Sequence, residues 1–176
     1  MNIRLYIHIT TDTMDPNQIQ EIFENARKDP ELFSTIDIEQ LLESIESDKN
    51  DYLDGKTLRD INNDIYEKIN TLITTTEKKQ EICNKLIGYR HVDELHELHK
   101  GKHVRWIRST INTLGDPKLT NGGIVTDIKF LDNGTHILCM NVLHRFVQYK
   151  FDDCITFQKL SAEEQLILMA YEHMDK

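Results

Sequence analysis

The chain has 176 residues, 39% of them hydrophobic and 29% charged, which suits one domain or two small ones with a buried core and a well-solvated surface. Its apolar runs are far shorter than the roughly 20 residues that a membrane helix needs. Its N-terminus alternates polar and apolar residues where a signal peptide would be continuously apolar. We therefore expect an intracellular protein that has no membrane partner.

The charge and the cysteine content indicate which partners and cofactors to expect. The net charge of −9 divides into −7 for residues 1–90, +1 for 91–160 and −3 for 161–176. This acidity opposes general attraction to phosphate backbones, so protein is favoured over nucleic acid as the partner. The three cysteines form no CxxC pair and are odd in number, which predicts neither a disulfide framework nor a common zinc site. We expect no cofactor.

The N-terminal region begins with one predicted strand and two predicted helices. Residues 2–10 alternate apolar and polar side chains, which is the period of a half-buried strand, and we expect this strand to join the β-rich segment further along the chain. Asp15 and Pro16 begin a helix that Pro30 ends. Asp37 begins a second helix that runs to about residue 46.

Three more helices are expected before residue 101. Thr57 is placed to cap a helix whose apolar stripe has three-and-four spacing. The stripe consists of Leu58, Ile61, Ile65, Ile69 and Leu72. Thr76 begins the next helix, and Gly88 ends it because glycine readily adopts the left-handed conformation found after a helix. A short helix is expected over residues 92–100.

Residues 101–160 are dense in β-branched and aromatic residues and are interrupted by Gly, Asn and Asp turns. This pattern predicts about five short antiparallel strands that form a small barrel. Gly122 and Gly123 open a long strand within it. Ser161 and Glu164 then have the spacing of a capping box, which predicts a final helix that closes one end of the barrel.

The segments G-K-H-V-R-W-I, from Gly101, and G-G-I-V-T-D-I, from Gly122, resemble segments of uncharacterised proteins of large DNA viruses. The block 101–160 also resembles SH3-like small barrels of the Tudor and KOW type, and this resemblance implies a five-stranded SH3-like barrel. The chain contains 21 Ile and 12 Asn residues against 3 Ala residues, a bias that is typical of an AT-rich genome. Both observations favour a viral origin.

The Tudor resemblance implies candidate ligand residues. Trp106, Phe146 and Tyr149 would form an aromatic cage that holds a methylated cation over its ring faces. Side chains alternate between the two faces of a strand, so Phe146 and Tyr149 fall on opposite faces. The three residues are therefore not expected to form one cage. The favoured interpretation is that these aromatic residues fill a barrel core.

A barrel that binds nucleic acid is a second interpretation. Single-strand-binding barrels combine cations that contact the backbone with aromatic stacking platforms. The candidate cations are Lys102, Arg105, Arg108, Lys129, Arg145 and Lys150. Acidic residues lie among them, and mixed charge of this kind is typical of an ordinary solvated surface.

Four clustered histidines give a third interpretation, a metal-dependent enzyme. The cluster consists of His91, His96, His99 and His103. His96 and His99 are one helical turn apart and could share a metal ion. Their spacing matches no HExxH or zinc-finger signature, no cysteine lies nearby, and no nucleophile motif or phosphate loop accompanies them. We therefore predict no metal site and no catalytic residue.

Together these patterns predict an α+β protein in three parts: an N-terminal strand and helical region over 1–100, a five-stranded SH3-like β-barrel over 101–160 and a C-terminal helix over 161–176. We expect a non-enzymatic protein that binds another protein through its barrel or helical surface. The viral resemblance implies an accessory or virion-associated protein of the host cytoplasm or the virion. An interaction protein should expose an apolar patch, whereas a nucleic-acid-binding protein should show a continuous positive stripe.

Overall fold

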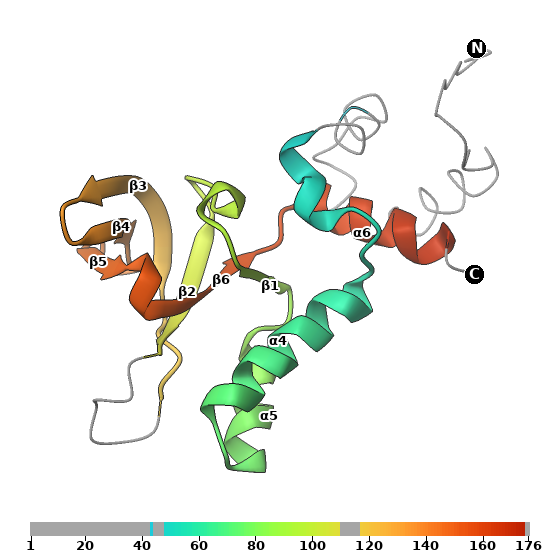
Figure 1. Cartoon of the computed structure of the whole chain (residues 1–176), viewed down its shortest axis with the longest axis horizontal. Helices are drawn as coiled ribbons and strands as arrows, with labels where there is room; N and C mark the ends of the chain where they lie inside the picture. The colour runs from blue at the N-terminus through green and yellow to red at the C-terminus, as the bar shows by residue number, and fades with distance from the viewer. Residues whose placement is uncertain (1–42, 44–47, 110–116, 175–176) are drawn as a thin grey trace.

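The computed structural model describes residue 43, residues 48–109 and residues 117–174. The predicted strand at 2–10 and the predicted helices at 15–30 and 37–46 lie outside these residues, apart from Glu43. Figure 1 shows the arrangement of the α-helices and strands. The described elements also include three short 3-10 helices, which we call η1, η2 and η3. In chain order the elements are η1 (Asp48–Leu53), α4 (Leu58–Leu72), α5 (Thr76–Lys85), β1 (Tyr89–Val92), η2 (Leu95–Glu97), β2 (His103–Arg108), β3 (Gly123–Leu131), β4 (Gly134–Met140), β5 (Phe146–Lys150), η3 (Phe151–Asp153), β6 (Cys154–Lys159) and α6 (Ala162–Met174).

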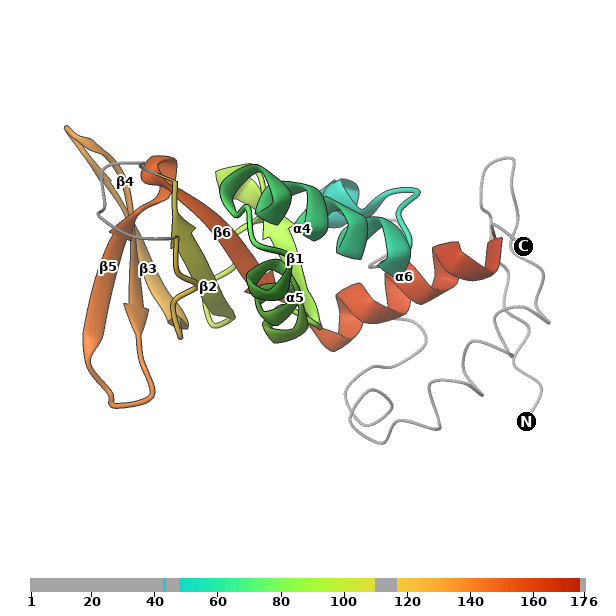
Figure 2. The same ribbon diagram turned by 90° about the horizontal axis from the view of Figure 1, so that it is seen from below.

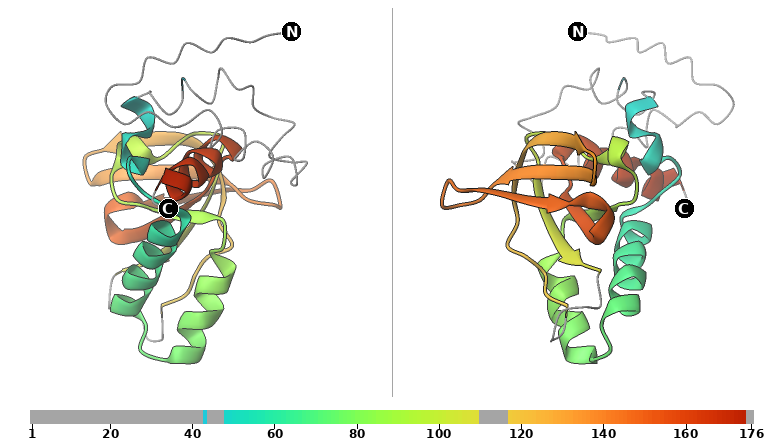
Figure 3. Two further views of the ribbon diagram at one scale, coloured as in Figure 1. Left: turned by 90° about the vertical axis from the view of Figure 1, so that its right-hand side faces the viewer. Right: turned by 60° about the vertical axis from the view of Figure 1, so that its left-hand side comes forward.

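The predicted helices that fall on described residues are confirmed at α4, α5 and α6. Thr57 caps α4 in a reciprocal capping box with Asp60, and the stripe at Ile61, Ile65 and Ile69 is buried. Gly88 follows α5 with a φ of 81°, the left-handed conformation expected after a helix. Figure 3 shows α4 and α5 packed side by side. No helix among the described residues combines the length and the apolar character needed to cross a bilayer.

The predicted helix over residues 92–100 is wrong. This part of the chain contains the end of strand β1 and the 3-10 helix η2. β1 pairs with β6, and His91 lies opposite Phe157 in the ladder. Only Val92 of this segment pairs with β6. The rest is held by contacts that no local pattern reveals, because Arg90 Nη2 donates to the Glu97 carbonyl and the His99 backbone N–H donates to Gln158 Oε1.

The strands of the described residues form one six-stranded antiparallel sheet in the order β1-β6-β2-β3-β4-β5. Five of these strands lie between residues 101 and 160, as expected, and β1 adds a sixth. The sheet is open, with β1 and β5 as its edges, so a closed five-stranded barrel is not confirmed. The chain is thus a mixed helix and sheet protein with a C-terminal helix.

The sheet curls strongly although it is open. Trp106 on β2 stacks on Tyr149 of β5, with ring centroids 4.1 Å apart, even though two strands separate β2 from β5 in the sheet. Thr156 Oγ1 on β6 also donates to the Tyr149 hydroxyl at 3.2 Å. In β3 a bulge between Val125 and Asp127 breaks the register, a device that bends strands. The inner side chains of β2 to β6 therefore meet across the curl.

Buried side chains form two clusters on opposite faces of β2 and β6. Ile107 and Phe157 belong to a cluster shared with α4, α5 and α6. Val104 and Trp106 belong to a second cluster shared with β3, β4 and β5. Alternate residues of a strand point to opposite faces, so one pair of strands contributes to both clusters. The side of β3, β4 and β5 that faces away from the second cluster is their outer face.

The division of the chain at residue 100 stays a prediction. β1 lies before this boundary and pairs with β6, which lies after it. α6 also contacts α4 and η1. The expected boundary thus crosses one continuous sheet.

Candidate functional site

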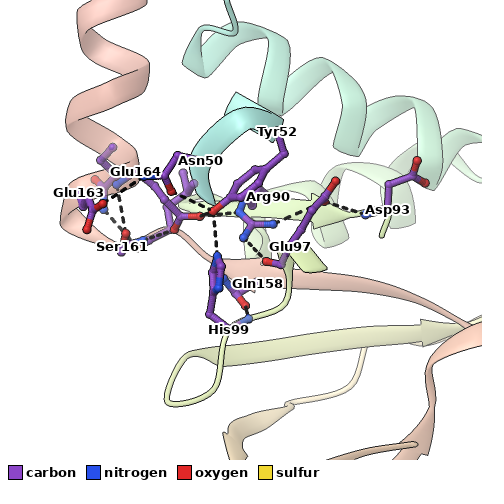
Figure 4. A network of polar contacts seen from close by, with 12 residues as sticks. Asn50, Tyr52, Arg90, Asp93, Glu97, His99, Gln158, Ser161, Glu163 and Glu164 are labelled. Atoms are coloured by element: carbon purple, nitrogen blue, oxygen red, sulfur yellow. Dashed lines mark hydrogen bonds and ion pairs between the residues drawn. The ribbon is translucent and has the colours of Figure 1, made fainter. Parts of the chain in front are cut away.

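A buried polar network joins the helices to the sheet (Figure 4). Its centre is Arg90 of β1, whose side chain is 1% exposed. The Arg90 Nε atom donates to Glu164 Oε1 of α6 at 2.7 Å. The guanidinium lies over the Tyr52 ring, 4.2 Å from its centroid, and Nη2 donates to the backbone carbonyl of Glu97. Four separate elements therefore meet at one arginine.

The positions of the protons in this network follow from its geometry. The Tyr52 hydroxyl donates its one proton to Glu164 Oε1 at 2.8 Å. The His99 Nε2 atom lies 2.9 Å from the same hydroxyl oxygen and must therefore be the donor in that contact. Burial, aided by the nearby Arg90 charge, lowers the pKa of His99. The ring is thus neutral at pH 7 and carries its proton on Nε2.

Glu164 is held ionised by its surroundings. Burial alone would raise the pKa of Glu164, but the Arg90 charge and hydrogen bonds from the Ser161 backbone, Arg90 and Tyr52 outweigh burial and lower it. The Ser161 backbone N–H donates to Glu164 Oε2 at 2.7 Å, and the Glu164 backbone N–H donates to Ser161 Oγ at 3.1 Å, so the predicted capping box is confirmed. A carboxylate held by three donors is a weak base. We assign this network a structural role.

The four clustered histidines contact different partners. His91 contacts Asp64, His96 contacts Asp51 and Glu94, His99 contacts Tyr52, and His103 contacts Tyr89. Within the part of the chain that the structure describes, no three His, Cys, Asp or Glu side chains gather as a metal ion requires. The metal-dependent enzyme therefore has no ligand set at these histidines.

The structure brings two of the three predicted cage residues together. Trp106 and Tyr149 are 6% and 3% exposed, and their rings stack at 16° to each other. Rings stacked in this way fill the space that a cation would occupy in a cage. Phe146 is on the opposite face of β5 and is 64% exposed.

The predicted cationic residues lie in different surroundings. The Arg105 guanidinium donates to the backbone carbonyls of Thr120 and Lys85, at 2.8 and 3.0 Å. Lys150 forms an ion pair with Asp153 at 3.5 Å. Arg145 is exposed in the turn after β4. The three therefore form no continuous positive stripe in the described part of the chain.

A pocket of about 310 Å³ lies beside Tyr149 and Lys150 and is also lined by Arg108, His136 and Cys154. A cysteine needs its thiolate form to act as a nucleophile. Burial raises the pKa of the Cys154 thiol to about 11, so the thiol is protonated at neutral pH. Cys154 is therefore not activated as a nucleophile in this pocket.

The outer face of β3, β4 and β5 has an apolar end. Directly opposed residues form a row across the three strands at Ile124, Met140 and Phe146. The adjoining turn exposes Val142 by 85% and Leu143 by 68%. We call these five residues the β4–β5 patch. Figure 2 shows the β4–β5 hairpin at the opposite end of the molecule from α6.

The turn that carries this patch is held in a defined conformation. His144 N–H donates to the Asn141 carbonyl at 3.0 Å, and His144 has a φ of 56°. This is a three-residue hairpin loop made of a tight turn followed by a left-handed residue. The Asn141 Oδ1 atom also accepts from the backbone N–H groups of Leu143 and Arg145 at 3.0 Å. The two exposed apolar side chains are thus presented by an ordered turn.

Sequence reasoning named Phe146 and missed the other four residues of the patch. One signal was present, because Val142 and Leu143 are apolar residues in a turn between two strands, where polar residues are usual. The Ile124 and Met140 contributions depend on strand register, which the sequence did not reveal.

Comparisons with known proteins found no matching family, no similar curated protein and no similar solved structure.

Proposed function

We propose that the protein is a non-enzymatic binding protein that recognises another protein through the β4–β5 patch. The observation that carries this proposal is the exposure of Val142, Leu143 and Phe146 at one ordered hairpin. Apolar patches of this kind mark protein interaction sites, and a large aromatic side chain is a frequent anchor of an interface. His144 and Gln148 are exposed beside the patch and supply polar neighbours.

The proposal includes an SH3-like fold for β2 to β6. It is supported by the order β6-β2-β3-β4-β5 within the sheet, by the 3-10 helix η3 between β5 and β6, and by the curl that stacks Trp106 on Tyr149. This arrangement resembles a small barrel with one open side. Because a fold of this kind hosts many functions, the binding role is argued from the patch and not from the fold.

A viral setting is part of the same proposal. Its support is the resemblance of the segments from Gly101 and Gly122 to proteins of large DNA viruses, together with the composition of the chain. We propose that the protein is an accessory or virion-associated component that meets its partner in the host cytoplasm or in the virion. Detection of the protein in purified virions, or in the cytoplasm of infected cells, tests this setting.

Site-specific photo-crosslinking tests the binding surface. A benzoylphenylalanine at position 142 of the full chain, expressed in cells where the protein occurs, should yield a defined crosslinked protein. The matched control is position 130 on the β3–β4 hairpin, because Phe130 is 74% exposed and lies outside the patch. Equal crosslinking at both positions, or none at 142, would contradict the proposal.

Substitutions provide an independent readout. Phe146→Ser should weaken capture of the crosslinked protein by at least about tenfold, because an interface anchor contributes roughly 2 kcal/mol or more. Phe130→Ser should leave capture unchanged. If nucleic acid is the partner instead, the retained material will be sensitive to nuclease, and binding will fall steeply with salt.

A further inference from the structure

β5 is an edge strand with one unused side. It pairs with β4 and has no other strand neighbour in the described part of the chain. The backbone N–H and C=O groups on such an edge are a template for another strand. Strand addition is an established way for one protein to hold an extended segment of another.

The hairpin turn determines which backbone groups face that free edge. Asn141 N–H donates to the Arg145 carbonyl at 2.9 Å, so these residues close the ladder as a hydrogen-bonded pair. Hydrogen-bonded and non-hydrogen-bonded pairs alternate along an antiparallel ladder. The odd-numbered residues of β5 therefore bond to β4, and the even-numbered ones direct their backbone groups to the free edge. The even-numbered residues are Phe146, Gln148 and Lys150.

The side chains along this edge show which segment would fit. Phe146 belongs to the β4–β5 patch, and Lys150 lies four residues further along the same face. Arg145 adds a second cation at the Phe146 end. Residues 133–151 contain no Asp or Glu, although the whole chain carries a net charge of −9. The Lys150 side chain is 33% exposed and pairs with Asp153 at 3.5 Å, so an acidic residue of a bound segment would replace that contact. The edge is a cationic and apolar region of an acidic protein, complementary to an acidic and apolar segment.

We propose that the partner binds as an extended strand added to the free edge of β5, with an apolar side chain beside Phe146 and an acidic one beside Lys150. Positions four apart in a strand lie on one face, about 13 Å from each other at ~3.3 Å per residue. The recognised segment thus carries an apolar and an acidic residue four positions apart. This inference rests on the proposed function and specifies how the partner is held.

A second copy of the chain fits this edge less well. If two β5 strands paired antiparallel about Gln148, Phe146 of each copy would lie opposite Lys150 of the other, and neither lysine would meet an acidic side chain across the pair. Cations on an edge strand are a common means of opposing such self-pairing. The charge pattern therefore favours a different protein as the occupant.

A displayed library of random twelve-residue peptides, selected on the full chain, tests the inference. Selected peptides should be enriched in an apolar and an acidic residue four positions apart, and calorimetry should measure their affinities. Gln148→Pro removes the backbone N–H at the centre of the free edge and should weaken binding at least about tenfold. Gln148→Ala is the matched control, because it removes the side-chain contact with His136 and keeps that N–H.

A second measurement does not depend on the folding of the proline variant. N-methylation of successive amides of a selected peptide should weaken binding only at alternate positions, because only every second amide of an added strand faces β5. Failure to select any peptide, binding to Gln148→Pro as tight as to the unchanged chain, or uniform tolerance of N-methylation would overturn strand addition. Loss of partner capture by Phe146→Ser would in that case still support the proposed function. A dimer that Gln148→Pro converts to a monomer would identify a second copy as the occupant instead.

Discussion

Arg90 shows how one residue can determine the position of several elements. Its side chain is buried as completely as that of Phe157, yet it carries a charge. A buried charge is tolerated only with a close partner of opposite charge and further hydrogen bonds. Glu164 supplies the nearer opposite charge at 2.7 Å, Glu97 supplies a second at 3.8 Å, and Tyr52 covers the guanidinium. The position of α6 is thus constrained by this ion pair as well as by the burial of Leu166, Ile167 and Leu168.

Glu164→Gln should lower the free energy of unfolding by about 3 kcal/mol at pH 7, because it removes the nearer of the two carboxylates that neutralise the buried Arg90 and leaves only Glu97, at 3.8 Å. The pKa of Glu164 is lowered by folding, so its contribution is complete above the usual value of 4.5 and is lost as the pH falls below it. Urea unfolding at several pH values should show the difference between the two proteins shrinking below pH 4.5. Glu172→Gln, at an exposed position of the same helix, is the control. A difference that stays constant with pH would contradict the assignment.

His144 occupies a left-handed conformation that costs most residues roughly 1 kcal/mol or more. His144→Gly should raise the free energy of unfolding by about 0.5 kcal/mol, since glycine adopts this φ freely but loses more entropy on folding. His144→Val should lower it. Urea unfolding of the three proteins checks the order, and a less stable glycine variant would show that the His144 side chain contributes more than its backbone conformation costs.

At the scale of elements, the passage from β2 to β3 depends on a glycine. A Cβ atom on Gly122 would lie 1.8 Å from the Val104 carbonyl oxygen, and the residue has a φ of 75°. Gly122→Ala should therefore lower the free energy of unfolding by about 3 kcal/mol or more, through both strain and the close contact. Gly101 has a similar φ of 82° with nothing within 4 Å, so Gly101→Ala measures the backbone cost alone. Thermal unfolding measures the loss of stability in each variant. Equal losses would show that the close contact with the Val104 carbonyl contributes nothing.

Elements with a complete local signal were predictable from the sequence, and those that depend on distant pairing were not. The helix from Leu58 to Leu72 has both a capping box and a regular stripe. The strand from Tyr89 to Val92 has neither, and it exists because β6 supplies its partner. The same limit applies to the candidate site. Phe146 could be named from its type, but its neighbours Ile124 and Met140 follow from register alone.

At the scale of the whole molecule, β6 connects the two hydrophobic clusters. Phe157 packs against the helices, and the adjacent Thr156 bonds to Tyr149 inside the curled sheet. Arg90 and Glu164 add a polar connection between β1 and α6. The β4–β5 hairpin lies at the opposite end of the molecule from α6 (Figure 2), and the exposed patch residues Val142, Leu143 and Phe146 take part in none of these contacts. Substitutions in the patch should therefore alter binding with little effect on folding.

Because β6 contributes to both hydrophobic clusters, the strands of residues 101–160 should depend on the helices for their stability. A fragment of residues 101–160 contains all five strands of the predicted barrel but lacks β1 and every helix that covers Ile107 and Phe157. Both side chains are fully buried, and exposure of each costs about 1.5–3 kcal/mol, which is a large share of the stability of a small domain. We expect this fragment to show no cooperative unfolding by circular dichroism in urea, whereas a fragment of residues 48–174 unfolds in one transition. Cooperative unfolding of the 101–160 fragment would mean that the strands hold together without the helices and that residue 100 is a true domain boundary.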